Sequence, residues 1–146
     1  MKTKMAMGAA AVMILAGTTT VPRAQEAART TNSGVYTEAQ AERGRVAVQN
    51  YCVSCHGGDL TGADVAPGLV GGSFLGNWTG QSIADLSSRI RVTMPLDRPG
   101  SLSSNTAADV VAYILKSNGY AAGGTELPSD PQGQGAISLE APKIKR

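Results

Sequence analysis

The chain contains 146 residues, of which 42% are hydrophobic and 16% are charged, and its formal net charge at pH 7 is +2. These values exclude an acidic or basic disordered polymer, and the small net charge argues against a nucleic-acid partner bound through a basic surface. The 18 glycines and the small number of aromatic residues predict many turns, and a core that something other than aromatic side chains must help to fill.

The first 24 residues have the order of a secretory signal peptide. Lys2 and Lys4 precede an apolar run over residues 5–17, and small polar residues follow it. This run is shorter than the roughly 17–25 residues of a membrane-spanning helix. We therefore predict a signal peptide over residues 1–24 that is cleaved near Ala24, a periplasmic mature protein, and no stable membrane insertion after cleavage. The alternative is an uncleaved amphipathic N-terminal helix.

The next segments are predicted to be a leader, a helix and a long loop. Residues 25–36 are expected to form a flexible leader. The first helix is predicted over residues 37–49, where Thr37 and Gln40 have the spacing of a capping box. Residues 57–80 are rich in glycine and are predicted to form a long loop. A loop of that length is uncommon in a small domain unless it has something to wrap around.

A second helix is predicted over residues 83–92. Ser82 and Asp85 have the spacing of an acidic capping box, and the apolar residues of the segment fall on one face. The pair Met94–Pro95 is expected to end the helix, because the residue before a proline avoids the helical region.

A third helix is predicted over residues 106–118, with Thr106 or Asn105 as its N-cap. Residues 121–146 are rich in Gly, Pro and Ser and are predicted to form a flexible C-terminal tail. No segment after the signal peptide alternates convincingly between apolar and polar residues, so strands are not expected. The domain between the leader and the tail is then residues 37–120.

The two cysteines and the single histidine of the chain lie together, as Cys52, Cys55 and His56 in the sequence CVSCH. This is the C-x-x-C-H pattern of covalent haem attachment, in which two thiols add to the haem vinyl groups and the adjacent imidazole reaches the iron. Three other readings stay open. A disulfide would close a very small loop and add little stability. A thioredoxin-type dithiol would need a βαβ context that the sequence does not indicate. Structural zinc normally takes four protein ligands, and this cluster supplies fewer.

The order of these elements, and several short stretches, resemble a monohaem class I cytochrome c from about residue 37 to residue 118. The order is a helix, the C-x-x-C-H motif, a Gly-rich loop with a proline, a short helix, a Met-Pro pair and a C-terminal helix. The stretches YCVSCHGGDLTG, APGLVGGSF, IRVTMP, PGSLS and ADVVAYILKSNG look more narrowly like the cytochromes that accompany quinoprotein (PQQ) alcohol and sugar dehydrogenases. The resemblance implies an all-α cytochrome c fold, with about three helices and long loops around one covalent haem c.

The axial ligands of the iron follow by elimination together with the resemblance. His56 is the single histidine, so bis-histidine ligation within the chain is impossible, and Met94 is the one methionine outside residues 1–24. The family places its distal ligand in such a Met-Pro context, so we predict His56 and Met94 as axial ligands; the alternative for Met94 is a core filler. Two filled axial positions predict one-electron transfer, and a thioether ligand raises the reduction potential. No second histidine is available as the distal acid/base of a peroxidase.

The resemblance also implies roles for residues around the haem. The Pro67 carbonyl is expected to accept the proton of His56 Nδ1, and the indole N–H of Trp78 is expected to bind a haem propionate. The alternatives are that Pro67 only shapes its loop and that Trp78 only packs. Arg89 and Arg91 are candidate propionate partners or, as the plainer reading, surface cations.

Two further expectations concern packing. Gly44 and Tyr113 are expected to mark the crossing of the first and last helices, since the family places a glycine against an aromatic residue there. Apolar residues from several segments are expected to form the wall of the haem pocket: Leu69, Phe74, Ile83, Leu86, Ile90, Leu102 and Ile114.

We predict from these observations a periplasmic electron carrier that is not itself an enzyme. It would accept electrons from a periplasmic dehydrogenase and pass them to the respiratory chain through an oxidase or another cytochrome, with electrons passing at the haem edge near Cys52 and Cys55. One alternative is a tightly bound cytochrome c subunit of a periplasmic quinoprotein dehydrogenase complex. Two others are a haem-based ligand sensor and a redox-active dithiol protein without haem.

Overall fold

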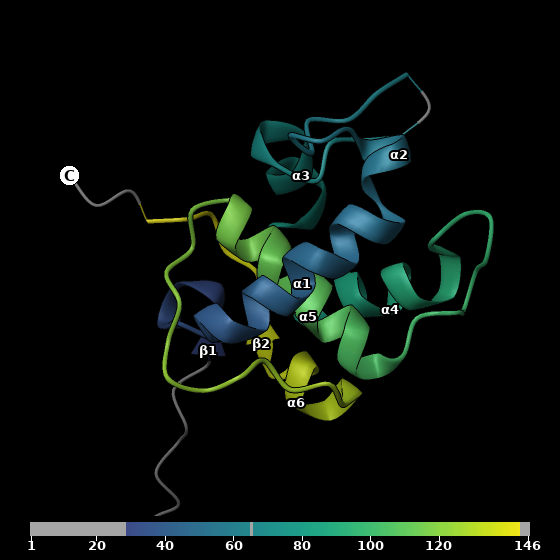
Figure 1. Cartoon of the computed structure of the whole chain (residues 1–146). Helices are drawn as coiled ribbons and strands as arrows, with labels where there is room; N and C mark the ends of the chain where they lie inside the picture. The colour runs from purple at the N-terminus through teal and green to yellow at the C-terminus, as the bar shows by residue number, and fades with distance from the viewer. Residues whose placement is uncertain (1–28, 65, 144–146) are drawn as a thin grey trace, which may run out of the picture.

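Helices dominate the computed structural model, which describes residues 29–64 and 66–143 (Figure 1). The predicted signal peptide and its cleavage position lie outside the described residues. Within them the elements are, in chain order, β1 (Arg29–Thr30), a 3-10 turn η1 (Thr31–Ser33), α1 (Glu38–Tyr51), α2 (Val53–His56), α3 (Gly71–Trp78), α4 (Ile83–Thr93), α5 (Ser104–Ser117), α6 (Pro131–Gly135) and β2 (Ile137–Ser138). The all-α prediction is confirmed, and α1, α4 and α5 are the three helices that the sequence predicts. None of the helices in these residues is long and apolar enough to cross a membrane.

The helix starts follow local side-chain caps. The Thr37 hydroxyl accepts the backbone N–H of Gln40 at 3.1 Å and begins α1. Ser82 and Asp85 form the predicted capping box of α4, each accepting a backbone N–H of the other. Helix α5 begins two residues earlier than predicted. Its cap is Ser103, which is neither of the two residues predicted for that role.

Helices α1 and α5 form the most extensive helix pair among the described residues, and Gly44 lies at their crossing. A Cβ atom on Gly44 would lie 1.8 Å from the carbonyl oxygen of Asp109 and 3.0 Å from Cβ of Tyr113. The predicted crossing of Gly44 and Tyr113 is therefore confirmed. Only a residue without a side chain allows the two backbones to approach this closely.

The predicted long loop over residues 57–80 is wrong for its second half, because residues 71–78 form α3. The sequence GGSFLGNW is a poor helix former, but its Phe74 is fully buried. No side chain of its own caps α3. Instead, Asn118 at the end of α5 accepts the N–H of Gly71 at 3.0 Å. Tertiary contacts therefore make a helix where local propensity does not.

The predicted flexible leader is wrong for its described part. Strand β1 pairs in parallel with β2, with Arg29 opposite Ile137. Val35 and Tyr36 are fully buried, and the hydroxyl of Tyr36 donates to the carbonyl of Tyr120 at 2.5 Å. Strands of two residues have no periodicity that a sequence pattern could reveal.

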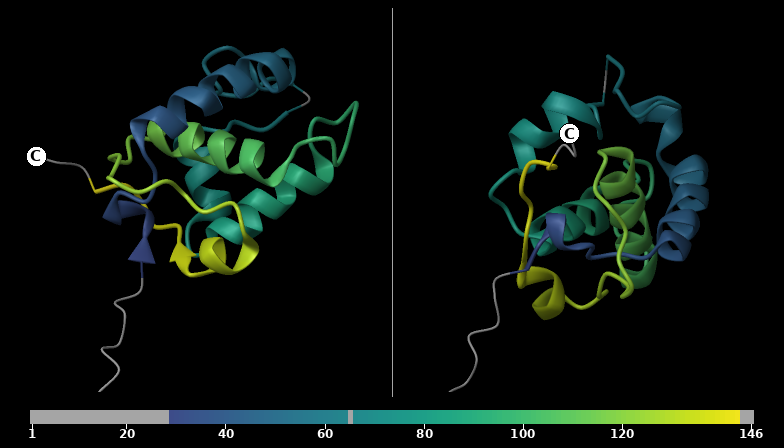
Figure 2. Two further views of the ribbon diagram at one scale, coloured as in Figure 1. Left: turned by 60° about the horizontal axis from the view of Figure 1, so that its bottom comes forward. Right: turned by 90° about the vertical axis from the view of Figure 1, so that its left-hand side faces the viewer.

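The predicted flexible C-terminal tail is also wrong over residues 121–143, which we call the C-terminal strap. The strap leaves α5, runs along the side of the molecule that carries β1, and returns through α6 and β2 (Figures 1 and 2). It buries Leu127, Ile137 and Leu139. Gln40 on α1 holds its middle, because the amide of that side chain makes hydrogen bonds to both the N–H and the carbonyl of Leu127. The folded domain thus reaches from residue 29 to residue 143.

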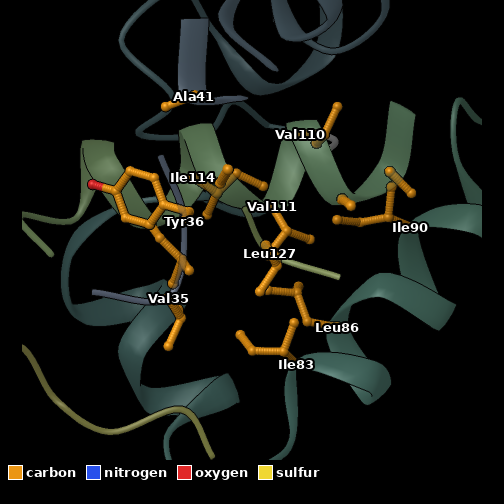
Figure 3. Close-up of a cluster of buried hydrophobic side chains, with 14 of the residues drawn as sticks. Val35, Tyr36, Ala41, Ile83, Leu86, Ile90, Val110, Val111, Ile114 and Leu127 are labelled. Atoms are coloured by element: carbon orange, nitrogen blue, oxygen red, sulfur yellow. The ribbon is translucent and has the colours of Figure 1, made fainter. Parts of the chain in front are cut away.

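The core lies between α1, α4, α5 and the strap, and it is mainly aliphatic. Figure 3 shows side chains from all four segments in this core, among them Ala41, Leu86, Val111 and Leu127. Tyr36 and Phe74 are the fully buried aromatic residues of the described chain. The core leaves one side of α4 and α5 to line a cavity, which holds the candidate site.

Candidate functional site

The C-x-x-C-H segment follows α1 directly, and its last four residues form the short helix α2. Cys52 donates its backbone N–H to the carbonyl of Val48 at 2.9 Å, and its own carbonyl accepts the N–H groups of Cys55 and His56 at 3.2 and 2.9 Å. Both cysteines are free thiols, Cys52 half-buried and Cys55 exposed. Burial raises the pKa of the Cys52 thiol to about 11, and Cys55 adds to the rise. Because this value lies well above 7, Cys52 is a neutral thiol at pH 7.

His56 is buried and has a defined orientation. Its Nδ1 lies 2.8 Å from the carbonyl oxygen of Pro67. A carbonyl only accepts hydrogen bonds, so Nδ1 carries the proton and the lone pair is left on Nε2. That tautomer makes Nε2 the available ligand atom.

The loop that supplies the Pro67 carbonyl is tightly folded around the histidine. The N–H of Gly62 donates to the carbonyl of His56 at 3.0 Å, and Leu69 donates to Leu60 at 2.8 Å. Gly68 packs so closely that an added Cβ would lie 2.7 Å from the carbonyl of Thr61. The position of the acceptor is therefore set by backbone packing.

A cavity of about 960 Å³ opens in front of this histidine. Its volume is at the upper end of the roughly 300–1,000 Å³ that is typical of ligand and cofactor sites. Five parts of the chain line it, namely the end of α1 with α2, the loop before α3, the end of α3 with the turn after it, α4 with the loop that leads into α5, and α5 itself. The lining residues are Asn50, Tyr51, Cys52, Ser54, Cys55, His56, Ala66, Pro67, Gly68, Leu69, Asn77, Trp78, Gln81, Leu86, Arg89, Ile90, Thr93, Met94, Pro95, Leu96, Asp97, Arg98, Leu102, Val110 and Ile114.

This cavity brings together the residues that were predicted to attach the haem, ligate its iron or support these groups: Cys52, Cys55, His56, Pro67, Trp78 and Met94. Met94 reaches it from the C-terminal end of α4, where its backbone is extended at φ −123° and ψ 153°. The predicted helix end at the Met-Pro pair is thus confirmed.

The predicted wall is correct for most of its members, and two differ. Leu69, Leu86, Ile90, Leu102 and Ile114 line the cavity. Phe74 and Ile83 do not; both are buried in the aliphatic core instead. The sequence shows that these residues are apolar, but not which of two adjacent apolar spaces each one faces.

The two arginines of α4, Arg89 and Arg91, differ in their position relative to the cavity. Arg89 lines the cavity and is exposed, whereas Arg91 does not line it. The Nε of Arg91 is buried without a hydrogen-bond partner among the described residues. A role beside the cavity therefore remains open for Arg89 alone of this pair.

Sequence reasoning missed a contact at the mouth of the cavity. The guanidinium of Arg98, in the loop after α4, lies 5.9 Å from the ring centre of Tyr51, which precedes the first cysteine. Nothing in the sequence signals this pairing, because the two residues belong to segments that are far apart along the chain. It joins the two sides of the cavity opening.

The donor set fits a covalently held haem. Two thiols, an imidazole with a free Nε2 and a thioether all border one large cavity whose lining is mostly apolar. Soft sulfur and imidazole donors are the ligands that iron porphyrins take in proteins. Within residues 29–64 and 66–143, no three His, Cys, Asp or Glu side chains are gathered around a common point as they would be for a bare metal ion.

Comparison with known proteins gives the family. Residues 39–114, about half of the chain, match the family model described as cytochrome c oxidase, cbb3-type, subunit III. No curated protein and no solved structure matches the chain. The matched region contains the C-x-x-C-H motif and the segments that line the cavity up to Ile114. A cytochrome c domain of this kind binds one haem c covalently and transfers electrons to and from redox protein partners. With its helical fold and its motif, this chain belongs to the family of cytochrome c domains that carries the description cytochrome c oxidase, cbb3-type, subunit III.

Proposed function

We propose that the protein is a periplasmic one-electron carrier in which His56 and Met94 are the axial ligands of the haem iron. The observation that carries this proposal is that both side chains border the same cavity, while the 2.8 Å bond from Nδ1 to Pro67 leaves Nε2 of His56 free. When bound, the haem supplies a reversible ferric–ferrous couple. The chain's own residues would determine how the haem is held and what its reduction potential is.

Cys52 and Cys55 would hold the haem through thioether bonds. One helical turn separates the two thiols, and the same turn carries His56. Attachment at both cysteines would fix the ring relative to the imidazole. The Pro67 carbonyl would keep the imidazole in one orientation and make it a stronger electron donor.

Met94 would complete the iron coordination from α4. It is the one methionine outside residues 1–24, and its side chain is half-buried at the cavity. A thioether stabilises ferrous iron over ferric iron and raises the reduction potential. With both axial positions filled, small molecules cannot easily reach the metal, which favours electron transfer over ligand binding.

Trp78 and Arg89 would act on the haem propionates. Both border the cavity, Trp78 as a partly buried indole and Arg89 as an exposed guanidinium. The indole N–H can only donate, and a carboxylate accepts. A hydrogen bond of this kind would hold the haem edge and lower the cost of burying the propionate charge.

The proposed partners are a periplasmic dehydrogenase as donor and an oxidase or another cytochrome as acceptor. The resemblance of the quoted stretches to cytochromes of quinoprotein (PQQ) dehydrogenases supports the donor. The signal-peptide pattern of residues 1–24 supports the periplasmic location.

The first test is the visible spectrum of protein expressed with the haem-attachment machinery. A sharp reduced α band, a methionine–iron charge-transfer band in the ferric form and no change with carbon monoxide are expected. A spectral shift with carbon monoxide would mean an open iron site and would turn the interpretation towards a ligand sensor.

Met94→Ala tests the ligand, with Leu102→Ala as matched control. Both residues border the cavity after α4. Met94→Ala should keep the haem attached, lose the charge-transfer band, lower the reduction potential and gain carbon monoxide binding. Leu102→Ala should keep the band and bind no carbon monoxide. An unchanged band and potential in Met94→Ala would refute methionine ligation.

A second candidate is a haem subunit fixed in an enzyme complex. The family description favours it, since it names a subunit of an oxidase, and a dehydrogenase complex would be an equivalent setting. Purification of the native protein from periplasm separates the two. A diffusing carrier elutes alone, whereas a fixed subunit elutes with a large partner in constant ratio.

A further inference from the structure

The C-terminal strap makes backbone hydrogen bonds with the residues immediately before α4. The N–H of Gly80 donates to the carbonyl of Leu139 at 2.8 Å, and the N–H of Leu139 donates to the carbonyl of Gln81 at 2.8 Å. A further bridge pairs Ser82 with Ser138. Ser82 is the N-cap of α4, so the strap is bound to the residues that start this helix.

Helix α6 of the strap packs on α4 itself. A Cβ on Gly135 would lie 4.0 Å from Cβ of Ala84, in the first turn of α4. Ser87, one turn later, is buried although it is polar. Ile137 and Leu139 are fully buried beside this contact. Helix α4 thus contacts α5 and the α6 and β2 segments of the strap, and the strap contacts include the start of α4.

The other end of α4 packs into the core through Ile90 and then leads into an exposed loop. After Met94 and the buried Pro95, residues 96–101 are exposed, and Leu96 is 76% exposed. Figure 1 shows this segment as a loop that projects from the molecule between α4 and α5. The position of Met94 therefore depends on the core contact of Ile90 and on the direction in which α4 is held at its start.

Small changes in that direction have large effects at Met94. An α-helix of 11 residues is about 16 Å long, so a tilt of about 4° at its start moves its far end by about 1 Å. A displacement of that size is comparable to the tolerance within which a ligand atom must be held.

We infer that residues 131–139 of the strap act as a clamp on the start of α4 that keeps Met94 on the iron. This inference rests on the proposed ligation by Met94. The strap lies outside the region matched by the family model, which ends at residue 114. It makes the distal ligand more firmly bound, and so keeps the sixth position closed to small molecules. The clamp residues touch neither iron nor haem, and their role is to position α4.

Imidazole binding to the ferric protein tests the clamp, because exogenous imidazole binds only when Met94 has left the iron. Its apparent affinity is the affinity of the open state multiplied by the population of that state. In Leu139→Ala we expect the apparent affinity to rise at least tenfold and the charge-transfer band to fade at lower temperature than the helical signal. Gln40→Leu is the control, because it loosens the strap at α1, away from α4. It should lower global stability and change imidazole affinity less than threefold.

The outcomes separate this inference from the proposed function. If the wild-type ferric protein has no methionine–iron band, the proposed ligation fails, and the clamp with it. If the band is present and Leu139→Ala and Gln40→Leu bind imidazole within threefold of each other, the clamp is overturned while the ligation stands. Should Leu139→Ala yield no folded protein, Ile137→Val decides. It removes one buried methyl group and should raise imidazole affinity about threefold, and no change would overturn the clamp.

Discussion

Replacing Gly44 by alanine tests whether the close crossing of α1 and α5 positions the site. The new Cβ would lie 1.8 Å from the carbonyl oxygen of Asp109 and 2.5 Å from its carbonyl carbon. Real Cβ contacts shorter than 3.0 Å are essentially never seen, so the helices must move apart by about 1.2 Å at this point. The obstacle is backbone, which cannot rotate away as a flexible side chain would.

The magnitude follows from two opposing effects. Overpacking of this kind costs about 3 kcal/mol, the upper part of the usual range. Alanine in place of a helical glycine returns about 0.5–1 kcal/mol. The net loss in the free energy of unfolding is therefore about 2 kcal/mol. Since α1 leads directly into Cys52 and His56, the same movement would shift the attachment segment relative to α5.

The matched control is Gly76→Ala in the exposed part of α3. A Cβ there meets nothing within 4 Å, and the backbone is helical. The control should gain about 0.5–1 kcal/mol, so the two variants should differ by about 3 kcal/mol. For a domain of this size that is about 12 °C in Tm. Guanidinium and thermal unfolding of the ferric protein, followed by far-ultraviolet circular dichroism, measure the difference. Equal stabilities would refute the reasoning from close approach.

Three further predictions concern polar contacts of the fold, of which two are buried and one lies at the surface. Tyr36→Phe should lower the free energy of unfolding by about 1 kcal/mol at pH 8, because the buried hydroxyl loses its bond to the carbonyl of Tyr120. Burial raises the pKa of Tyr36 to about 12, so the folded state holds this proton more tightly than the unfolded chain does. The contribution of this pKa difference to the free energy of unfolding is fully present below pH 10, and it is lost as the pH rises from 10 towards 12. Unfolding at pH 8 and pH 11.5 should therefore show a smaller loss in Tyr36→Phe than in the wild type, and equal losses would contradict the assignment. Gln40→Leu leaves the buried N–H and carbonyl of Leu127 unpaired and should cost about 2–4 kcal/mol in guanidinium unfolding. Arg43→Gln breaks ion pairs of a half-exposed side chain and should cost less than about 1 kcal/mol; a loss as large as that of Gln40→Leu would show that this surface network is more important than its exposure indicates.

Local patterns predicted those features that depend on neighbours along the chain. The C-x-x-C-H motif places its thiols and imidazole within one turn, so its chemistry is readable from spacing alone. The capping pair Ser82–Asp85 worked for the same reason, because a cap joins residues three positions apart. Of the capping box predicted for Thr37 and Gln40, only the hydrogen bond from the Gln40 N–H to the Thr37 hydroxyl forms. The Gln40 side chain does not return to the cap but binds Leu127, a partner distant in sequence.

Predictions that depended on composition were less successful. Glycine and proline content predicted flexible ends and a long loop, yet α3 and the strap are ordered. Their stability comes from a few buried apolar residues, such as Phe74 and Leu139, in otherwise polar or Gly-rich stretches. Composition averages over a segment, whereas burial is decided one side chain at a time.

The sequence by itself determined the cofactor chemistry, the three main helices, the single histidine, and the one methionine outside residues 1–24, which we propose as the second iron ligand. These follow from residue identity and from spacings of three or four positions, which the helix converts directly into proximity. Only the tertiary structure decided that Phe74 and Ile83 pack in the core away from the cavity, that Leu86 borders both, that Asn118 caps α3, and that Leu139 binds the residues before α4. Each of these depends on a partner from a distant part of the chain, and such partners meet only when the whole core is packed.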